Sequence, residues 1–187
     1  NARWYKVDPA TGEDVITEVY SEADRYFLDK KAIPAITGGF GTNVQYGNFS
    51  LAVQFAYQLG GYGIDNEYFG LLGATTNVTN FADYDKTWTV DNPTASLPRV
   101  DPLEPDQYRV TDMRLVDQSY LSISNINVGY LFQNETIKKY NIDSIRLYGT
   151  VNNGFLLYSA RQGYDPRLNS VGASSAEFGA NRTISMG

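Results

Sequence analysis

Carboxylates are the first side chains whose spacing could support chemistry. The run Asp101-Pro102-Leu103-Glu104-Pro105-Asp106 offers oxygen ligands of the kind that Ca²⁺ prefers. It lacks the spaced glycine and the closing bidentate glutamate of a recognised calcium loop. We therefore interpret the run as a solvated turn, and we expect no metal and no cofactor.

Acid–base and nucleophilic chemistry has little support in the composition. The 187 residues contain no histidine and no cysteine. These are the commonest transition-metal ligands, and histidine is also the usual general base. An enzyme is therefore not the favoured interpretation.

An acidic segment carries the whole net charge of the chain. Residues 62–117 contain ten acids and four bases, which accounts for the net charge of −6. This disfavours nucleic acid as a partner, because phosphate contacts need clustered Lys and Arg. Tyr84 and Trp88 lie in this segment, where a ring could stack on a sugar or could anchor the loop to the underlying scaffold.

The scaffold is indicated by residues 49–60, which alternate without exception between large apolar and small or polar residues. A period of two is typical of a β-strand with different environments on its two faces. A soluble sandwich usually carries charges on its outer face, yet no charge occurs in residues 32–64 or 118–134. A charge at mid-membrane on a barrel's lipid face costs about 2–4 kcal/mol. The pattern predicts an outer-membrane β-barrel.

Five antiparallel strands are expected, with short turns on one side and long loops on the other. Gly47-Asn48 is a hairpin signal, and aromatic residues cluster near the short turns, as in an interfacial girdle: Tyr46, Phe49, Tyr130 and Phe132. The expected strands are residues 35–46, 49–61, 119–133, 144–154 and 182–187. The expected long loops are residues 1–33, 62–118 and 155–181, with a short strand at 14–20 inside the first.

Alternation also assigns the two faces of the strands. The residues expected toward lipid are Phe49, Leu51, Val53, Phe55, Tyr57 and Leu59. Those expected toward the lumen include Ser50, Ala52, Gln54, Ala56, Gln58, Asn125, Asn127, Tyr148 and Asn152. Such polar residues line a substrate path, touch a plug, or simply form a wet barrel interior.

Five strands are too few to close a barrel, since about eight is the smallest size whose interior side chains can fill. Open edges would expose unpaired backbone groups to lipid, at a cost of several kcal/mol each. No leader-like segment opens the sequence, and no run of about 18 apolar residues predicts a transmembrane helix. We therefore expect a piece of a larger protein or assembly.

Several segments resemble, in order, the C-terminal part of the SusC/RagA family of TonB-dependent outer-membrane transporters. They are Asp8-Pro9-Ala10-Thr11-Gly12, Ile33-Pro34, Gly38-Gly39-Phe40, Ser119-Tyr120-Leu121, Asn125-Ile126, Val128-Gly129-Tyr130, Ile145-Arg146-Leu147-Tyr148, Asn152-Asn153-Gly154-Phe155, Gly163-Tyr164-Asp165-Pro166 and Arg182-Thr183-Ile184-Ser185-Met186-Gly187. Two features depart from the family: Gly154 stands where a larger apolar residue is usual, and the terminal aromatic of the last strand is missing.

The resemblance implies a wall segment of a plugged barrel of roughly 22 strands. The implied partners are a SusD-like lipoprotein lid, TonB through a missing upstream part, outer-membrane lipid, and an oligosaccharide or peptide substrate. It suggests Tyr84, Trp88 and Tyr164 as contacts of substrate or lid. Two alternatives stay open: a passive porin or adhesin, and a soluble all-β glycan-binding domain.

Overall fold

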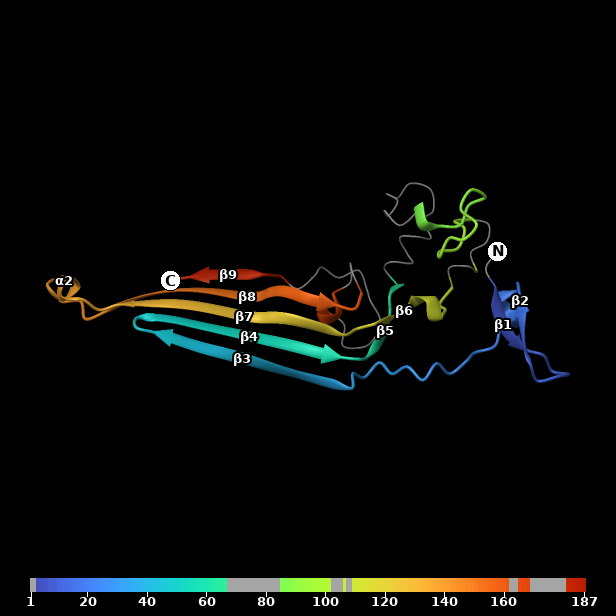
Figure 1. Cartoon of the computed structure of the whole chain (residues 1–187), viewed down its shortest axis with the longest axis horizontal. Coiled ribbons are helices and arrows are strands. Elements are labelled where there is room, and N and C mark those ends of the chain that lie inside the picture. The colour runs from blue at the N-terminus through green and yellow to red at the C-terminus, as the bar shows by residue number, and fades with distance from the viewer. Residues whose placement is uncertain (1–2, 67–84, 102–105, 107–108, 162–164, 169–180) are drawn as a thin grey trace. The chain divides into compact units, whose positions relative to one another are not determined.

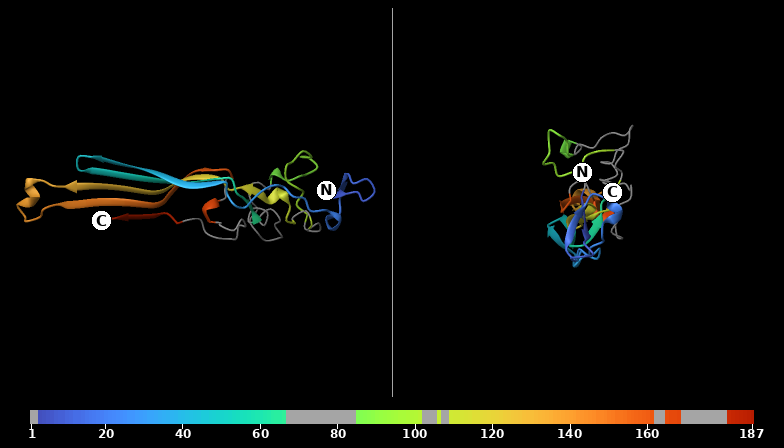
Figure 2. Two further views of the ribbon diagram at one scale, coloured as in Figure 1. Left: turned by 90° about the horizontal axis from the view of Figure 1, so that it is seen from below. Right: turned by 90° about the vertical axis from the view of Figure 1, so that its right-hand side faces the viewer.

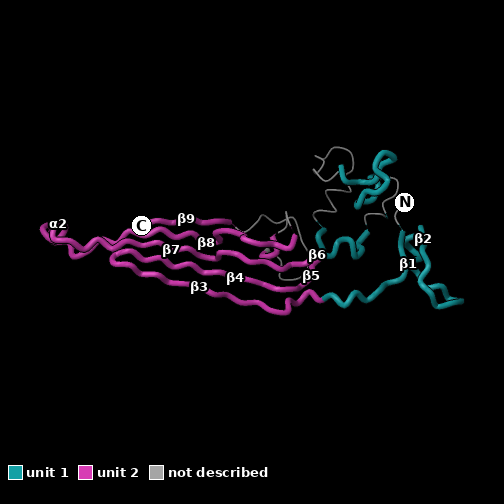
Figure 3. The backbone as a smooth tube through the Cα atoms, in the orientation of Figure 1, with its two compact units in different colours: residues 1–30, 64–115 teal, residues 31–63, 116–187 magenta. Residues whose placement is uncertain are grey.

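The computed structural model describes residues 3–66, 85–101, 106, 109–161, 165–168 and 181–187 (Figure 1). The chain divides into two compact units, residues 1–30 with 64–115 and residues 31–63 with 116–187 (Figure 3). Among the described residues, no helix is both long and apolar enough to cross a membrane.

The second unit contains a five-stranded antiparallel sheet with the order β3-β4-β7-β8-β9. Figures 1 and 2 show these strands side by side. Their bounds are Ile36–Tyr46, Phe49–Leu59, Tyr120–Phe132, Ile145–Ser159 and Thr183–Met186. β3 and β9 form the two edges of this sheet, each with one neighbour among the described strands.

The hairpin of β3 and β4 turns at Gly47, whose φ of +56° suits the first central position of a two-residue turn. Pairing is continuous from Tyr46 opposite Phe49 to Ile36 opposite Leu59. Across the sheet, β4 pairs with β7, which lies about 60 positions further along the chain, and the register shifts once, after Gln54. Two residues that are paired across neighbouring strands point to the same face of the sheet. The apolar residues of β4 therefore lie beside the apolar residues of β7.

β7 and β8 are joined through a single helical turn, α2 (Glu135–Lys138). The side chain of Asn134 accepts a hydrogen bond of 3.1 Å from the amide of Ile137 and so caps the turn. Asn141 then takes a φ of +58° before β8 begins. This connection is short, as expected for one side of a strand meander.

β8 differs from its predicted range of 144–154, because it continues to Ser159. Asn152-Asn153-Gly154 has the composition of a turn but forms a bulge, with Asn153 at a φ of +51°. Beyond the bulge, Phe155 pairs with Ile123 and Tyr158 with Leu121. The predicted loop 155–181 therefore begins too early, and two further aromatic residues belong to the sheet.

The predicted loops 1–33 and 62–118 also contain strands, of which β2 (Asp14–Thr17) falls within the short strand expected at 14–20. In the first unit, β1 (Trp4–Val7) and β2 form an antiparallel hairpin. Gly12, at a φ of +72°, closes its turn by donating a 2.8 Å hydrogen bond to the carbonyl of Asp8. A third, two-stranded sheet pairs β5 (Tyr62–Ile64) with β6 (Leu115–Asp117). Three short 3₁₀ turns complete the described elements: η1 (Tyr20–Glu22), η4 (Asp112–Arg114) and η5 (Pro166–Leu168).

Candidate functional site

One face of the five-stranded sheet, here called the apolar face, carries no charged residue on any of its strands. The register places the following side chains on it: Ile36, Phe40, Thr42, Val44, Tyr46, Phe49, Leu51, Val53, Phe55, Tyr57, Leu59, Leu121, Ile123, Ile126, Val128, Tyr130, Phe132, Ile145, Leu147, Val151, Phe155, Tyr158, Ile184 and Met186. The rings of Phe40 and Phe55 stack at 4.7 Å between centroids. All six residues predicted toward lipid on β4 lie on this face.

The apolar face is exposed. Phe40 is 55% exposed, Tyr46 84% and Ile184 66%. Apolar surface of this extent marks a surface that contacts another protein or a membrane. At about 3.3 Å per residue and a tilt of about 40°, the 11 residues of β4 rise roughly 28 Å, close to the apolar band of about 25 Å on outer-membrane barrels.

The opposite face, here called the polar face, carries mainly small or uncharged polar side chains, with two leucines and one arginine. Its members are Thr37, Gly39, Gly41, Asn43, Gln45, Ser50, Ala52, Gln54, Ala56, Gln58, Tyr120, Ser122, Asn125, Asn127, Gly129, Leu131, Arg146, Tyr148, Thr150, Asn152, Leu156, Ser159, Thr183 and Ser185. All nine residues predicted toward a lumen lie here together, among them Gln54, Gln58, Asn125, Asn127, Tyr148 and Asn152. That this face lines a lumen stays a prediction.

Amide and hydroxyl groups link neighbouring strands across the polar face. Asn125 Nδ2 donates to Asn152 Oδ1 at 2.7 Å, and Asn127 Nδ2 donates to Thr150 Oγ1 at 2.7 Å. Alternation along β8 also predicts Thr150 on this face, because it has the same parity as Asn152. These cross-strand pairs hold uncharged polar groups in fixed positions.

Gln58 has a structural role at the end of the sheet where β4 meets β7. Its amide nitrogen lies within hydrogen-bonding distance of the carbonyls of Gly60, at 3.4 Å, and Gln118, at 3.3 Å. Ser119 Oγ accepts a 2.8 Å bond from the amide of Gly60 and donates a 2.6 Å bond to Asp117. This network fixes the ends of β4 and β7. The side-chain amide of Gln58 is hydrogen-bonded to two backbone carbonyls within it.

Arg146 is the charged residue of the polar face. It lines a cavity of about 280 Å³ near the β3–β4 turn, together with Gln45, Gly47, Asn48, Ser50, Tyr130 and Leu131. Gly129 leaves room for it: a Cβ there would lie 2.6 Å from Ser50 Oγ and 3.7 Å from an Arg146 nitrogen. Arg146 forms no ion pair with any residue that the structure describes.

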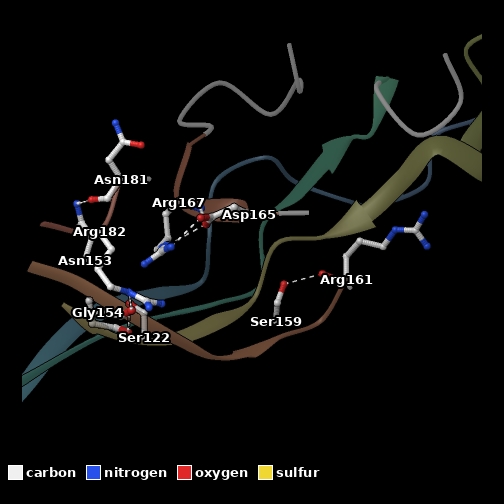
Figure 4. Close-up of polar contacts among 10 residues, drawn as sticks. Ser122, Asn153, Gly154, Ser159, Arg161, Asp165, Arg167, Asn181 and Arg182 are labelled. Carbon is white, nitrogen blue, oxygen red and sulfur yellow. Dashed lines mark hydrogen bonds and ion pairs between the residues drawn. The ribbon is translucent and has the colours of Figure 1, made fainter. Parts of the chain in front are cut away.

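Two more arginines lie near the bulge of β8 (Figure 4). Arg167 forms a bidentate pair with Asp165 through Nε at 2.8 Å and Nη2 at 2.7 Å, and this hydrogen bonding raises the pKa of Arg167. Arg182 donates from Nε to the carbonyl of Gly154 at 2.7 Å. Its guanidinium carbon lies 4.3 Å from the centre of the Phe155 ring, within the range of a cation–π contact.

The proposed substrate and lid contacts are only partly described. Trp88 is half-buried, and its amide donates a 2.9 Å hydrogen bond to the carbonyl of Leu97. Tyr84 and Tyr164 lie outside the described residues. Of the acidic run, Asp101 pairs with Arg99 and Asp106 with Arg109. Within the described ranges, no group of three or more Asp and Glu residues is placed to hold a metal ion.

Two groups beside the hairpin of β1 and β2 have perturbed titration. The phenol of Tyr26 donates a 2.7 Å hydrogen bond to Asp14, which raises the pKa of Tyr26 to about 12. Hydrogen bonding and charge attraction from Lys6, with a bond from Thr17, lower the pKa of Glu22. These contacts hold the segment after β2 against the hairpin.

Comparison with known proteins relates the chain to TonB-dependent transporters. No family model matches it. It is 25% identical over 195 residues to TonB-dependent receptor P3 of Formosa agariphila, covering 96% of this chain and 19% of that protein. The structure is similar to the RagAB peptide importer in its closed-closed state, with a TM-score of 0.76, 26% identity, and coverage of 98% of this chain and 20% of that one. It is also similar to the open-open state, with a TM-score of 0.68 and 22% identity over 92% of this chain and 18% of that one.

The chain thus spans about one fifth of the length of the relatives it matches. The predicted resemblance to SusC/RagA-like TonB-dependent transporters is confirmed. The predicted all-β, antiparallel fold class is also confirmed, and this chain covers only part of the barrel. The relatives reported above are named as a receptor and an importer.

Proposed function

We propose that this chain forms part of the wall of a TonB-dependent importer in the cell outer membrane. Its apolar face would contact lipid and its polar face the lumen. The observation that carries the proposal is the five-stranded sheet with one charge-free face and one polar face, together with the match to the RagAB importer over 98% of the chain. A lipid-facing strand needs this segregation because a charge at mid-membrane costs about 2–4 kcal/mol.

The two edges of the sheet support a role as part of a larger wall. β3 and β9 each pair with one described strand, so the outer edge of each presents backbone groups to be paired by further strands. In a bilayer, an unpaired backbone group costs several kcal/mol. A closed barrel made with the rest of a longer protein removes this cost, in keeping with the one-fifth coverage of the relatives.

The imported substrate is proposed to be a peptide or an oligosaccharide, and the partner a SusD-like lipoprotein lid. The RagAB structures are described as those of a peptide importer or transporter, which favours a peptide. Trp88, with Tyr84 and Tyr164, would contact the substrate or the lid. TonB would act through a part of the protein upstream of this chain.

Uptake in cells that carry the full-length protein tests this proposal. Labelled oligopeptides and labelled oligosaccharides are supplied in parallel, with and without TonB. The proposal expects uptake of one class that is lost when TonB is absent. Uptake that persists without TonB would support a passive porin instead, and extraction of the protein without detergent would support a soluble glycan-binding domain.

A further inference from the structure

Arg182 is a charged side chain at the margin of the apolar face. It precedes β9 by one residue, and it lies two residues before Ile184, which pairs with Val151 on that face. Its guanidinium lies over the ring of Phe155, a member of the same face. The five strands themselves place no charged side chain on the apolar face, so Arg182 introduces a cation where the surroundings are otherwise apolar.

The bulge of β8 holds Arg182 in this position. Asn153, at a φ of +51°, interrupts regular pairing, and the Gly154 carbonyl accepts the 2.7 Å bond from Arg182 Nε. Asn153 Nδ2 donates to the carbonyl of Asn181 at 3.2 Å and so ties down the residue before the arginine (Figure 4). A bulge often serves to redirect a group out of the ladder.

The outer edge of the Arg182 guanidinium is available for a ligand. Arg182 is exposed, and its two terminal nitrogens make no hydrogen bond or ion pair with any residue that the structure describes. The ring of Phe155 occupies one flat side and the Gly154 carbonyl occupies Nε. Two parallel N–H groups remain, a geometry that matches two oxygens of a phosphate.

We propose that Arg182 binds the phosphate of an anionic lipid that packs against the apolar face. The acyl chains would lie along the apolar residues beside Phe155, and the headgroup would meet the guanidinium where the chain enters β9. Ile184 is aligned through Val151 and Ile126 with Val53, so Arg182 lies two residues beyond that level, toward the loop that precedes β9. Because a cation on the lipid face is costly in a depth-dependent way, pairing with a phosphate would stabilise Arg182 there. The inference rests on the proposed placement of the apolar face in the membrane. It goes beyond the proposed import function, which does not itself require that Arg182 binds a lipid.

Native mass spectrometry of the full-length protein tests the inference. Protein purified in neutral detergent is mixed with phosphatidylglycerol or with phosphatidylcholine, and bound lipids are counted. We expect Arg182→Gln to retain about fivefold less phosphatidylglycerol than the unmodified protein, because one basic residue near an anionic surface contributes about that factor. Arg182→Lys should fall between them, since a lysine keeps the charge but loses the planar pair of donors.

Arg146→Gln is the matched control, since it removes an arginine from the polar face and should leave lipid retention unchanged. Equal retention of phosphatidylglycerol by the Arg182→Gln and unmodified proteins would overturn the inference. So would displacement of the lipid from the unmodified protein by millimolar inorganic phosphate alone, which would reassign Arg182 to a free anion. Failure of the membrane placement gives a different result: the unmodified protein would leave the membrane fraction without detergent.

Discussion

Asn125 Nδ2 donates a 2.7 Å hydrogen bond to Asn152 Oδ1 across β7 and β8, while the next pair, Ile126 and Val151, lies on the opposite face of the sheet. A shift of register by one residue would exchange these environments for every residue of a strand. The arrangement of polar and apolar pairs therefore fixes both the register and the direction in which each face must point.

Spin labels on β4 test the direction of the faces. Labels at Val53 and Gln54, in the full-length protein in membranes, should differ in accessibility because these neighbours lie on opposite faces. We expect oxygen to relax the label at Val53 more strongly and an aqueous reagent to relax the label at Gln54 more strongly. Equal accessibility at the two positions would contradict a lipid-facing apolar face.

An arginine placed at either of these positions tests the energetic cost. Val53→Arg should impair assembly more than Gln54→Arg, because only Val53 would place the charge in the middle of the lipid, at about 2–4 kcal/mol. Heat-modifiable migration of the full-length protein on gels measures the folded fraction. If the two variants fold to the same extent, the faces have been assigned the wrong way round.

The strands of high regularity could be predicted from the sequence, because alternation on β3 and β4 is uninterrupted and specifies the face of each residue. On β7 the same holds from Asn125 onward, while the irregularity at Ser124 changes the parity of the residues before it. The end of β8 could not, because Asn153 and Gly154 have the composition of a turn while pairing with Ile123 and its neighbours carries the strand further. The short strand expected at 14–20 contains β2, but its partner β1 has only four residues, so periodicity gives little signal there. Tertiary pairing decides such cases.

Close packing at Gly129 gives a prediction about stability. A Cβ at this position would lie 2.6 Å from Ser50 Oγ, and overpacking of this kind costs about 1–3 kcal/mol. Gly129→Ala should therefore lower the unfolding midpoint of the full-length barrel in urea, and adding Ser50→Ala should restore most of the loss. Gly149→Ala is the control, because nothing lies within 4 Å of its added methyl group. Similar midpoints for the two alanine variants would contradict the packing argument.

Tyr26 gives a prediction about pH. Its hydrogen bond to Asp14 raises the pKa of the phenol from 10.0 to about 12. Between these values the unfolded chain loses this proton and the folded hairpin keeps it, so the stability contributed by the bond is present below pH 10 and is lost as the pH rises toward 12. The difference in ultraviolet titration between the unmodified and Tyr26→Phe proteins should show one phenol ionising near pH 12, and a midpoint near 10 would contradict this.

The candidate site was predictable where it depends on parity and less so where it depends on side-chain geometry. Alternation alone predicts which face carries the following polar residues: Gln54, Gln58, Asn125, Asn127, Tyr148 and Asn152. The role of Gln58 at the strand ends depends on its bond to the carbonyl of Gln118, 60 positions further along the chain, and no local pattern indicates that contact. Arg182 shares a face with Ile184 by parity, but its contact with Phe155 depends on the bulge.

The last prediction concerns the acidic segment, which we expect to lie outside the cell and to contact the lid or a neighbouring loop. Several of its apolar side chains are exposed, among them Val90 at 83%, Val110 at 56% and Met113 at 49%, and such groups are stabilised by a partner surface. Trypsin added to intact cells should therefore cut after Lys86 and Arg99 slowly when the lid protein is present and faster when it is deleted. The exposed Lys138 of α2 is an internal control, since it should resist trypsin until the outer membrane is permeabilised. Rapid cleavage after Lys86 in both strains would mean that the acidic segment has no partner in the lid.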